Sequence, residues 1–278
     1  MSEKRQPDEV LDAAVRTFIA DAQRELHTRW GAWPRTFGRN HVFEVLGALL
    51  ARQVTVACQI ASSPQMWEPH SGPIFMRAMA DVHITVAWIL LEPDDRAQKF
   101  IHHGLGQAKL EIEHRRAELA GGRTPKPGET DLLKARERWI DAQRLMFLTS
   151  VNLGAWSGIN TRQMAEEAGC LDFYNYVYVP FSGCAHSMWH HVGVFNLQRC
   201  TNPLHGLHSI PALPDFDTVG GEPHTLYLAG KYLDKTCRAI DVVFPGPKEP
   251  VSAFDVLSDS LDEVYQLARD LNPGAEEA

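Results

Sequence analysis

Several patterns that identify common protein classes are missing from this 278-residue sequence. Its five cysteines include no Cys-x-x-Cys pair, and an odd number at wide spacing favours free thiols in a reducing compartment. No stretch approaches the roughly 18 uninterrupted apolar residues typical of a membrane-spanning helix. Residues 1–7 are charged rather than apolar, unlike a signal peptide. We therefore expect a cytoplasmic protein with no membrane segment.

An excess of positive charge is also missing. Lys and Arg number 27 against 35 Asp and Glu, so the formal net charge is −8 and no global field draws the chain to nucleic acid. This net charge argues against a simple DNA-coating role, although it is compatible with a local basic patch. There is no glycine-rich phosphate loop and no Gly-x-Ser-x-Gly elbow, which disfavours the common nucleotide-binding and hydrolase folds.

What is present is helical periodicity, with no alternating strand pattern and no internal repeat. Apolar residues recur at three- and four-residue spacing in most of the chain, and Pro, Gly and N-cap residues separate the segments. The expected helices span residues 8–30, 40–62, 72–91, 94–120, 131–152, 161–168, 171–198, 225–244 and 253–271. We predict an all-α protein, a single bundle of about seven to nine helices over residues 1–273, with a frayed tail at 274–278.

Three segments of this bundle have distinctive features. The helix at 72–91 is apolar nearly all round, which is typical of a helix in the centre of a bundle. The helix at 171–198 contains Pro180 and Gly183, and Pro180 predicts a kink. Residues 200–223 are rich in Pro, Gly and His without any period, and such a long irregular loop usually has a function or contacts a partner.

Arg77 and Asp81 lie four residues apart on the apolar helix, a spacing at which side chains pair. One interpretation is a structural ion pair inside the bundle, where removing one partner would leave an uncompensated charge. The other is that Arg77 faces a cleft and Asp81 orients it. His83 is predicted to point to a different side of the helix.

A second polar stripe runs along residues 171–198, where Tyr174, Tyr178, Ser182, His186 and His190 follow one another at intervals of four. The predicted kink at Pro180 would open space beside Ser182 and His186. A hydroxyl one turn before an imidazole is the minimum geometry for a base and its partner. The alternative is that these side chains place polar tips at one end of the bundle.

Two metal interpretations are disfavoured, and we expect no metal and no cofactor. Glu111 and His114 have the Glu-x-x-His spacing of di-iron bundles, but they lie opposite the apolar face of their helix and have no second copy. His186, His190 and His191 with the loop residues His205 and His208 lack the Glu of a zinc-protease motif.

The chain resembles a bacterial family known as a domain of unknown function, number fifty-six seventy-seven. The resemblance covers roughly residues 40–245 and rests on Arg77 with an acid four residues later, on Trp156-Ser157-Gly158 and Met164-Ala165-Glu166, and on the stripe from Tyr174 to His186. The family usually has Glu where this chain has Asp81.

The arrangement is more distantly similar to the HEPN superfamily of helical nucleotide-binding proteins from toxin and phage-defence systems. Those proteins often carry an Arg, a polar residue and a His within one helix and cleave RNA without metal. Here Tyr178, Val179 and Pro180 stand where that Arg is expected, and the string from Arg77 to His83 spans two helix faces. The resemblance implies a homodimer that binds or cleaves RNA or a nucleotide, in a stress or phage-defence role.

Three functions therefore stay open. In the first, the chain binds or cleaves RNA or a nucleotide, with His186, Arg77 and Ser182 as the catalytic candidates and Asp81, Tyr178 and His190 as substrate contacts. In the second, it is a regulatory module whose loop at 200–223 docks a protein partner. In the third, it is a metal-dependent enzyme that uses the histidines.

Overall fold

The computed structural model describes residues 6–34, 36, 38–147, 157–206, 208–214, 221–246 and 252–271. It is 78% helix, which confirms the all-α prediction. The expected tail at 274–278, the end of the helix expected to reach 152, and Trp156 lie outside the described residues.

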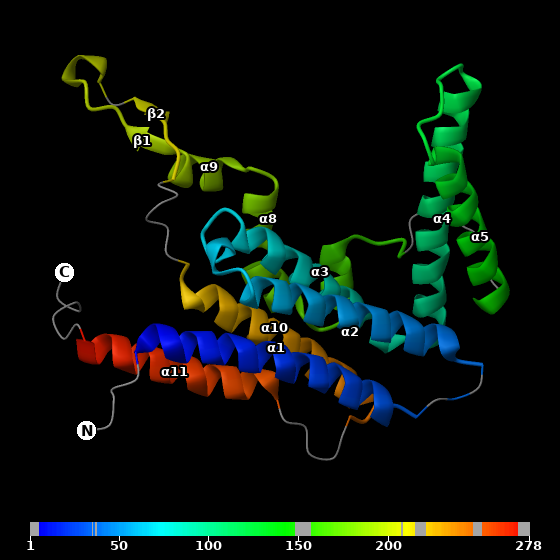
Figure 1. Ribbon diagram of the computed structural model, residues 1–278, viewed down its shortest axis with the longest axis horizontal. Helices are drawn as coiled ribbons and strands as arrows, with labels where there is room; N and C mark the ends of the chain where they lie inside the picture. Colours follow the sequence, from blue (N-terminus) through cyan, green and yellow to red (C-terminus); the bar gives the residue numbers. More distant parts are fainter. Residues whose placement is uncertain are drawn as a thin grey trace.

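Five long helices make the body of the molecule (Figure 1). They are α1 (Pro7–Ala32), α2 (Asn40–Ala61), α3 (Gly72–Leu91), α10 (Pro223–Val243) and α11 (Ala253–Leu271). The pairs α1–α11, α10–α3 and α10–α2 pack most extensively. Helices α2 and α10 therefore form a layer between α3 on one side and the pair α1 and α11 on the other. Fully buried side chains from all five, such as Phe18, Leu50, Ile84, Leu233 and Leu257, form one continuous core.

By length and composition alone, α2 and α3 would each be able to cross a membrane. In the structure both lie within the bundle, where α2 contacts α1, α3, α4 and α10. The position of α3, packed by α2 and α10 on one side and by α8 on another, confirms the prediction for this apolar helix.

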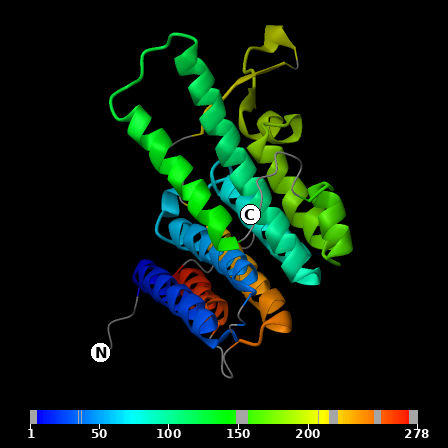
Figure 2. The same ribbon diagram turned by 90° about the vertical axis from the view of Figure 1, so that its right-hand side faces the viewer.

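A pair of helices, α4 (Pro93–Ala120) and α5 (Glu129–Phe147), extends away from the body (Figures 1 and 2). It has a small core of its own, made of Leu105, Ile112, Leu133 and Ile140. Glu111 is exposed on the other face of α4 and pairs with Arg136 at 3.1 Å, and His114 is exposed as well. This confirms that the Glu-x-x-His sequence lies on a solvated face.

The segment predicted as one helix over 171–198 is divided. After α6 (Thr161–Glu167) come α7 (Leu171–Phe173), a π-helical turn η2 (Tyr174–Tyr178), α8 (Val179–Ala185) and α9 (Trp189–Phe195). The helix passes Pro180 without a break because the wider turn just before it accommodates a residue with no N–H. The chain interrupts its helix later than predicted, at residues 186–188.

That interruption is a helix C-cap of the Schellman type. The N–H of Met188 donates to the Gly183 carbonyl at 2.8 Å, and the N–H of Ser187 donates to Cys184 at 3.0 Å. Ser187 has a φ of 50°, a left-handed conformation that glycine usually supplies. A glycine at this position would have predicted the end of the helix from the sequence, but the residue is a serine.

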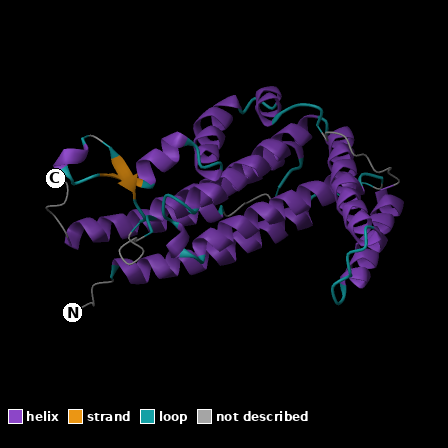
Figure 3. Cartoon of the chain, turned by 90° about the horizontal axis from the view of Figure 1, so that it is seen from above, coloured by secondary structure: helices purple, strands orange, loops and turns teal. Residues whose placement is uncertain are grey.

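The expectation that the chain has no strands was wrong in one place. Residues 197–211, which overlap the predicted irregular loop at 200–223, form a hairpin of β1 (Leu197–Arg199) and β2 (Ser209–Pro211), joined through the 3-10 turn η3 (Pro203–His205). A further 3-10 turn, η1, spans Pro64–Met66 between α2 and α3. Figures 1 and 3 place the hairpin and the α4–α5 pair at opposite ends of the long axis.

Two buried polar networks join the helices of the body. In the first, Arg29 on α1 pairs with Glu25 and donates to both carboxylate oxygens of Asp241 on α10. Glu25 also accepts the N–H of Ala253 at the start of α11, at 3.1 Å. Burial raises the pKa of Glu25, although the positive charge of Arg29 acts to lower it. This network ties together the three helices α1, α10 and α11.

In the second network, Gln53 of α2 donates to Thr236 of α10 at 2.9 Å, and the Nδ1 atom of His83 lies 3.2 Å from the same hydroxyl. His83 is 3% exposed and packs edge-on against Phe173. Burial, with a smaller contribution from Lys235, lowers the pKa of His83 to about 3. As predicted, His83 faces a different side of α3 from Arg77.

Candidate functional site

The face of α3 that looks toward η2 and α8 brings four of the predicted residues together. The Nε atom of Arg77 donates to the Ser182 hydroxyl at 2.6 Å, and its Nη1 atom pairs with Asp81 one turn along α3. The guanidinium carbon lies 3.4 Å from the centre of the Tyr178 ring. Arg77, Asp81, Tyr178 and Ser182 are called the Arg77 cluster below.

The Arg77 cluster is partly buried, with side-chain exposure of 14% for Arg77 and 47% for Asp81. Desolvation raises the pKa of Asp81, although the charge and hydrogen bond of Arg77 act to lower it. Among the described residues the Nη2 atom of Arg77 has no hydrogen-bond partner. The Arg77 guanidinium is thus held in place by its other contacts, and its Nη2 atom is left to donate to a ligand.

Local structure explains why Tyr178 and Ser182 meet Arg77. They lie four residues apart across the junction of η2 and α8, so both face α3. Tyr174 stacks on Tyr178 with ring centres 4.7 Å apart, and the Tyr178 hydroxyl donates to Thr161 at 3.4 Å. The Tyr178 ring is therefore fixed on several sides. Thr161 is a member of this site that sequence reasoning missed.

The two histidines of the predicted stripe lie at the end of this arrangement. His186 is the exposed C-cap residue of α8, one turn beyond Ser182. Its backbone N–H donates to the Ser182 carbonyl at 3.0 Å, and within the described residues its imidazole has no hydrogen-bond partner. His190 belongs to α9, on the other side of the break, and its ring packs so closely on Gly183 that a Cβ there would collide with it. The stripe does not continue as one helix face, because α8 ends at Ala185.

A second group of histidines lies nearby and was not predicted. The rings of His70 and His191 are 5.5 Å apart, and the Phe195 ring lies 5.8 Å from His70. Burial and the charges of His70 and His190 lower the pKa of His191. His70 also lines a cleft of about 380 Å³ with Gln65, Glu68, Ser71, Asn196, Leu213 and Pro214. Sequence patterns did not predict this group, because His70 and His191 are more than 100 residues apart in the sequence.

Residues 43–200 match a family described as a family of unknown function, DUF5677. The match covers more than half of the chain. The chain belongs to this family. No curated protein and no solved structure matches it.

The DUF5677 segment is shorter than the predicted similarity over residues 40–245, and it ends before α10. It contains the whole Arg77 cluster together with His186 and His190. His205 and His208 lie beyond it.

The hairpin histidines are not gathered with those of the helices. The structure places His205 and His208 beside Cys200, with potential donor atoms within 4.8 Å of one another. Within the described residues no histidine of α8 or α9 belongs to that group. Cys200 is free, like the other four cysteines, which confirms the prediction of free thiols.

Proposed function

We propose that this DUF5677 protein binds a phosphate-bearing ligand, single-stranded RNA in the first place, through Arg77. The observation that carries the proposal is the way Arg77 is held, with Tyr178 against its face, Asp81 and Ser182 on two of its nitrogens, and Nη2 left over. A guanidinium fixed in this way loses little side-chain entropy when it binds a phosphate oxygen.

RNA is favoured over a mononucleotide by two exposed aromatic side chains, one in η2 and one at the start of α9. Tyr176 of η2 is 79% exposed and Trp189 at the start of α9 is 75% exposed. Exposed aromatic rings are the surfaces on which unpaired bases stack, independently of sequence. A net charge of −8 opposes binding over the whole surface, so binding depends on this local site.

Cleavage is the finer part of the proposal and depends on His186. The distant resemblance to HEPN proteins suggested by the sequence motifs is a further part of the proposal, and it would imply metal-independent RNA cleavage by an Arg and a His, together with a homodimer and a stress or phage-defence role. In this chain the arginine comes from α3 and the histidine from the end of α8. His186 is accessible one turn beyond Ser182, where it would act as acid or base on a bound phosphodiester.

The competing interpretation of the Arg77 cluster is a structural brace. Asp81 is nearly half exposed, so water would solvate its carboxylate after loss of Arg77. Because the Arg77 side chain is only 14% exposed, the contribution of the pair lies between the about 0–1 kcal/mol of exposed pairs and the about 3–5 kcal/mol lost when a buried pair is broken. A small stability change combined with a large binding change would support the ligand role, and the reverse would support the brace.

The test is fluorescence anisotropy with a labelled single-stranded RNA, comparing wild type, Arg77→Met and Arg96→Met. Arg96 is a matched control because it also stacks on an aromatic ring, Trp88, and pairs with a carboxylate, Glu167. We expect Arg77→Met to weaken binding at least about tenfold and to lower the salt slope by about one. Equal affinity of the wild type and Arg77→Met, or equal losses in both variants, would refute the site.

Cleavage is tested separately through the integrity of total RNA after expression of wild type and His186→Ala in a bacterial host. Fragmentation by the wild type alone would support catalysis by His186. If both proteins leave RNA intact while the anisotropy result holds, the protein binds RNA without cleaving it.

A further inference from the structure

The hairpin at residues 197–211 brings a thiol and two imidazoles to one face of a short sheet. Its register pairs Leu197 with Pro211 and Arg199 with Ser209. The N–H of Cys200 donates to the His208 carbonyl at 3.2 Å, so Cys200 and His208 form the next pair of the ladder. Residues directly opposite one another in an antiparallel pair project to the same side. The register of the hairpin therefore places the Cys200 thiol next to the His208 imidazole.

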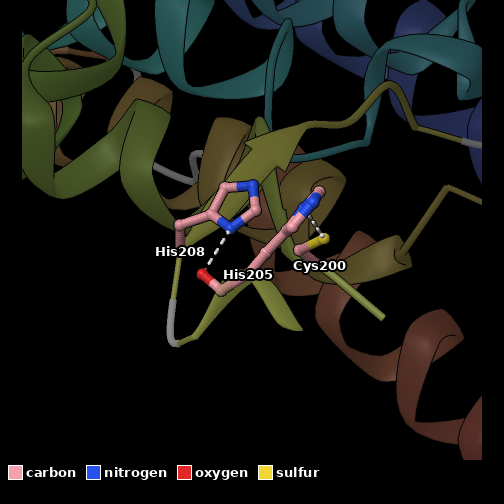
Figure 4. A group of neighbouring side chains, drawn as sticks. All are labelled: Cys200, His205 and His208. Atoms are coloured by element: carbon pink, nitrogen blue, oxygen red, sulfur yellow. Dashed lines mark hydrogen bonds between the residues drawn. The ribbon is translucent and has the colours of Figure 1, made fainter. Parts of the chain in front are cut away.

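The connection between the strands supplies the third group. The 3-10 turn η3 ends at His205, and Gly206 with a φ of +63° reverses the chain directly after it. Asn202 fixes the start of this turn by accepting the N–H of Leu204 at 3.0 Å. Figure 4 shows the His205 ring turned back over Cys200, with the His208 ring beside it.

The separation of sulfur and nitrogen fits a shared metal ion as well as it fits the hydrogen bond that links the two atoms in the structure. The Sγ atom of Cys200 lies 3.6 Å from Nδ1 of His205. In a tetrahedral zinc site, bonds of about 2.3 Å to sulfur and about 2.05 Å to nitrogen place the two atoms about 3.6 Å apart. The two ligands are thus already at the distance that tetrahedral zinc requires.

The surroundings of His208 also suit a metal ligand. Its Nδ1 atom lies 3.1 Å from the His205 carbonyl oxygen, which accepts an N–H and so assigns the ring proton to Nδ1 (Figure 4). Nε2 then carries the lone pair, the arrangement that backbone carbonyls commonly impose on metal-bound histidines. Nδ2 of Asn202 lies 3.0 Å from Nε2 of His205, and its amide oxygen is held by the Leu204 N–H. Metal on Nδ1 of His205 moves the ring proton to Nε2, so binding would break the hydrogen bond between Asn202 and His205.

We propose that Cys200, His205 and His208 bind one Zn²⁺ ion, with a water or a donor from outside the chain in the fourth position. A thiolate with two imidazoles suits Zn²⁺, whereas Mg²⁺ and Ca²⁺ prefer oxygen ligands. Binding releases the thiol proton of Cys200 to solvent, so one thiolate and two neutral imidazoles leave the site with a charge of +1.

A bound ion would stabilise the hairpin, which has little other stabilisation. Each strand has three residues, and Leu204 at the tip is 90% exposed, so this part of the chain buries little apolar surface. An isolated two-stranded hairpin is marginally stable in water. A metal that binds only the folded arrangement contributes its binding free energy to folding of the hairpin. This site is separate from the Arg77 cluster, and two of its three ligands lie outside the DUF5677 segment.

The experiment uses full-length protein, stripped of metal, kept reduced, and titrated with Zn²⁺ in competition with a chromophoric chelator. The variants are Cys200→Ser and His208→Ala, with Cys170→Ser and His190→Ala as matched controls. His190→Ala also tests the helix histidines as an alternative metal site. Co²⁺ in place of Zn²⁺ gives a second readout, since tetrahedral thiolate-bound Co²⁺ absorbs in the visible range.

We expect one equivalent of Zn²⁺ in the wild type and both controls, and at least about a 100-fold weaker affinity in Cys200→Ser and His208→Ala. The visible Co²⁺ bands should disappear in the same two variants. Zinc should also slow alkylation of Cys200 in the wild type. The proposal is overturned if the wild type binds no stoichiometric Zn²⁺, or if the ligand variants bind it as tightly as the controls. RNA binding by Arg77 is measured in a separate assay, so either proposal can fail alone.

Discussion

The network of Glu25, Arg29 and Asp241 gives the sharpest stability prediction. The side chains of Glu25 and Arg29 are 5% and 3% exposed, so Arg29→Met leaves the Glu25 carboxylate buried with one backbone N–H as partner. Breaking a buried ion pair on one side costs about 3–5 kcal/mol. With an unfolding entropy of about 2.1 cal/mol/K per residue, a chain of this length should lose about 5–9 °C in Tm.

The assay is urea unfolding of wild type, Arg29→Met and the double variant Glu25→Gln with Arg29→Met. The double variant should regain the part of the loss that comes from Glu25, because a neutral amide needs no cation. Asp241, whose side chain is 24% exposed, lacks Arg29 in both variants. The loss in Arg29→Met should also shrink from pH 7 to pH 5. Burial already raises the pKa of Glu25 in the wild type, and loss of Arg29, which acts to lower it, should raise this pKa further in the variant. The folded variant therefore takes up the proton at a higher pH than the wild type and regains stability as the pH falls. A single variant within about 1 kcal/mol of wild type, or a double variant as unstable as the single one, would refute this reasoning.

Three further predictions follow from described contacts. Arg77→Met should cost clearly less stability than the about 3–5 kcal/mol of Arg29→Met, because Asp81 is 47% exposed and stays solvated, although the Ser182 hydrogen bond and the Tyr178 contact are lost. Urea midpoints of the two variants check this contrast. His83 is neutral when folded, with a pKa of about 3, and takes up a proton at about 6.5 when unfolded. Its contribution is therefore complete above about pH 6.5 and declines below it by up to about 1.4 kcal/mol per pH unit, a slope that His83→Gln should lack. Ser187→Gly should stabilise the protein by about 0.5–1 kcal/mol because φ is positive there, whereas Ser187→Ala should give no gain in thermal unfolding.

Local signals were sufficient for most of the helices. Pro93 and the Gly121-Gly122 pair marked the ends of α4, and the apolar surface of α3 predicted its central position. The sequence did not predict the end of α8 or the two short strands. Ser187, and not a glycine, has the left-handed conformation that ends α8, so the sequence predicted a helix that continues to residue 198. Strands of three residues are too short to show an alternating pattern.

For the candidate site, the sequence predicted which residues belong together but not how they meet. Arg77 and Asp81 were paired from their spacing, and Tyr178 and Ser182 from theirs, but the contact between the two pairs spans 105 residues. The same is true of Arg29 and Asp241, 212 residues apart, whose pairing no local pattern indicates. The catalytic role of His186 stays a prediction, which RNA integrity in His186→Ala will test.

The position of α10 bears on how this family is to be handled as a protein fragment. Helix α10 comes after residue 200, yet its Thr236 hydrogen bonds with Gln53 inside the bundle, and its Tyr232 packs on Phe173. A polypeptide cut at residues 43 and 200 would present the apolar sides of α2 and α3 to water. In this chain the matched segment is thus smaller than the packed bundle, and we expect a recombinant piece to need at least α1 and α10 to cover these two helices.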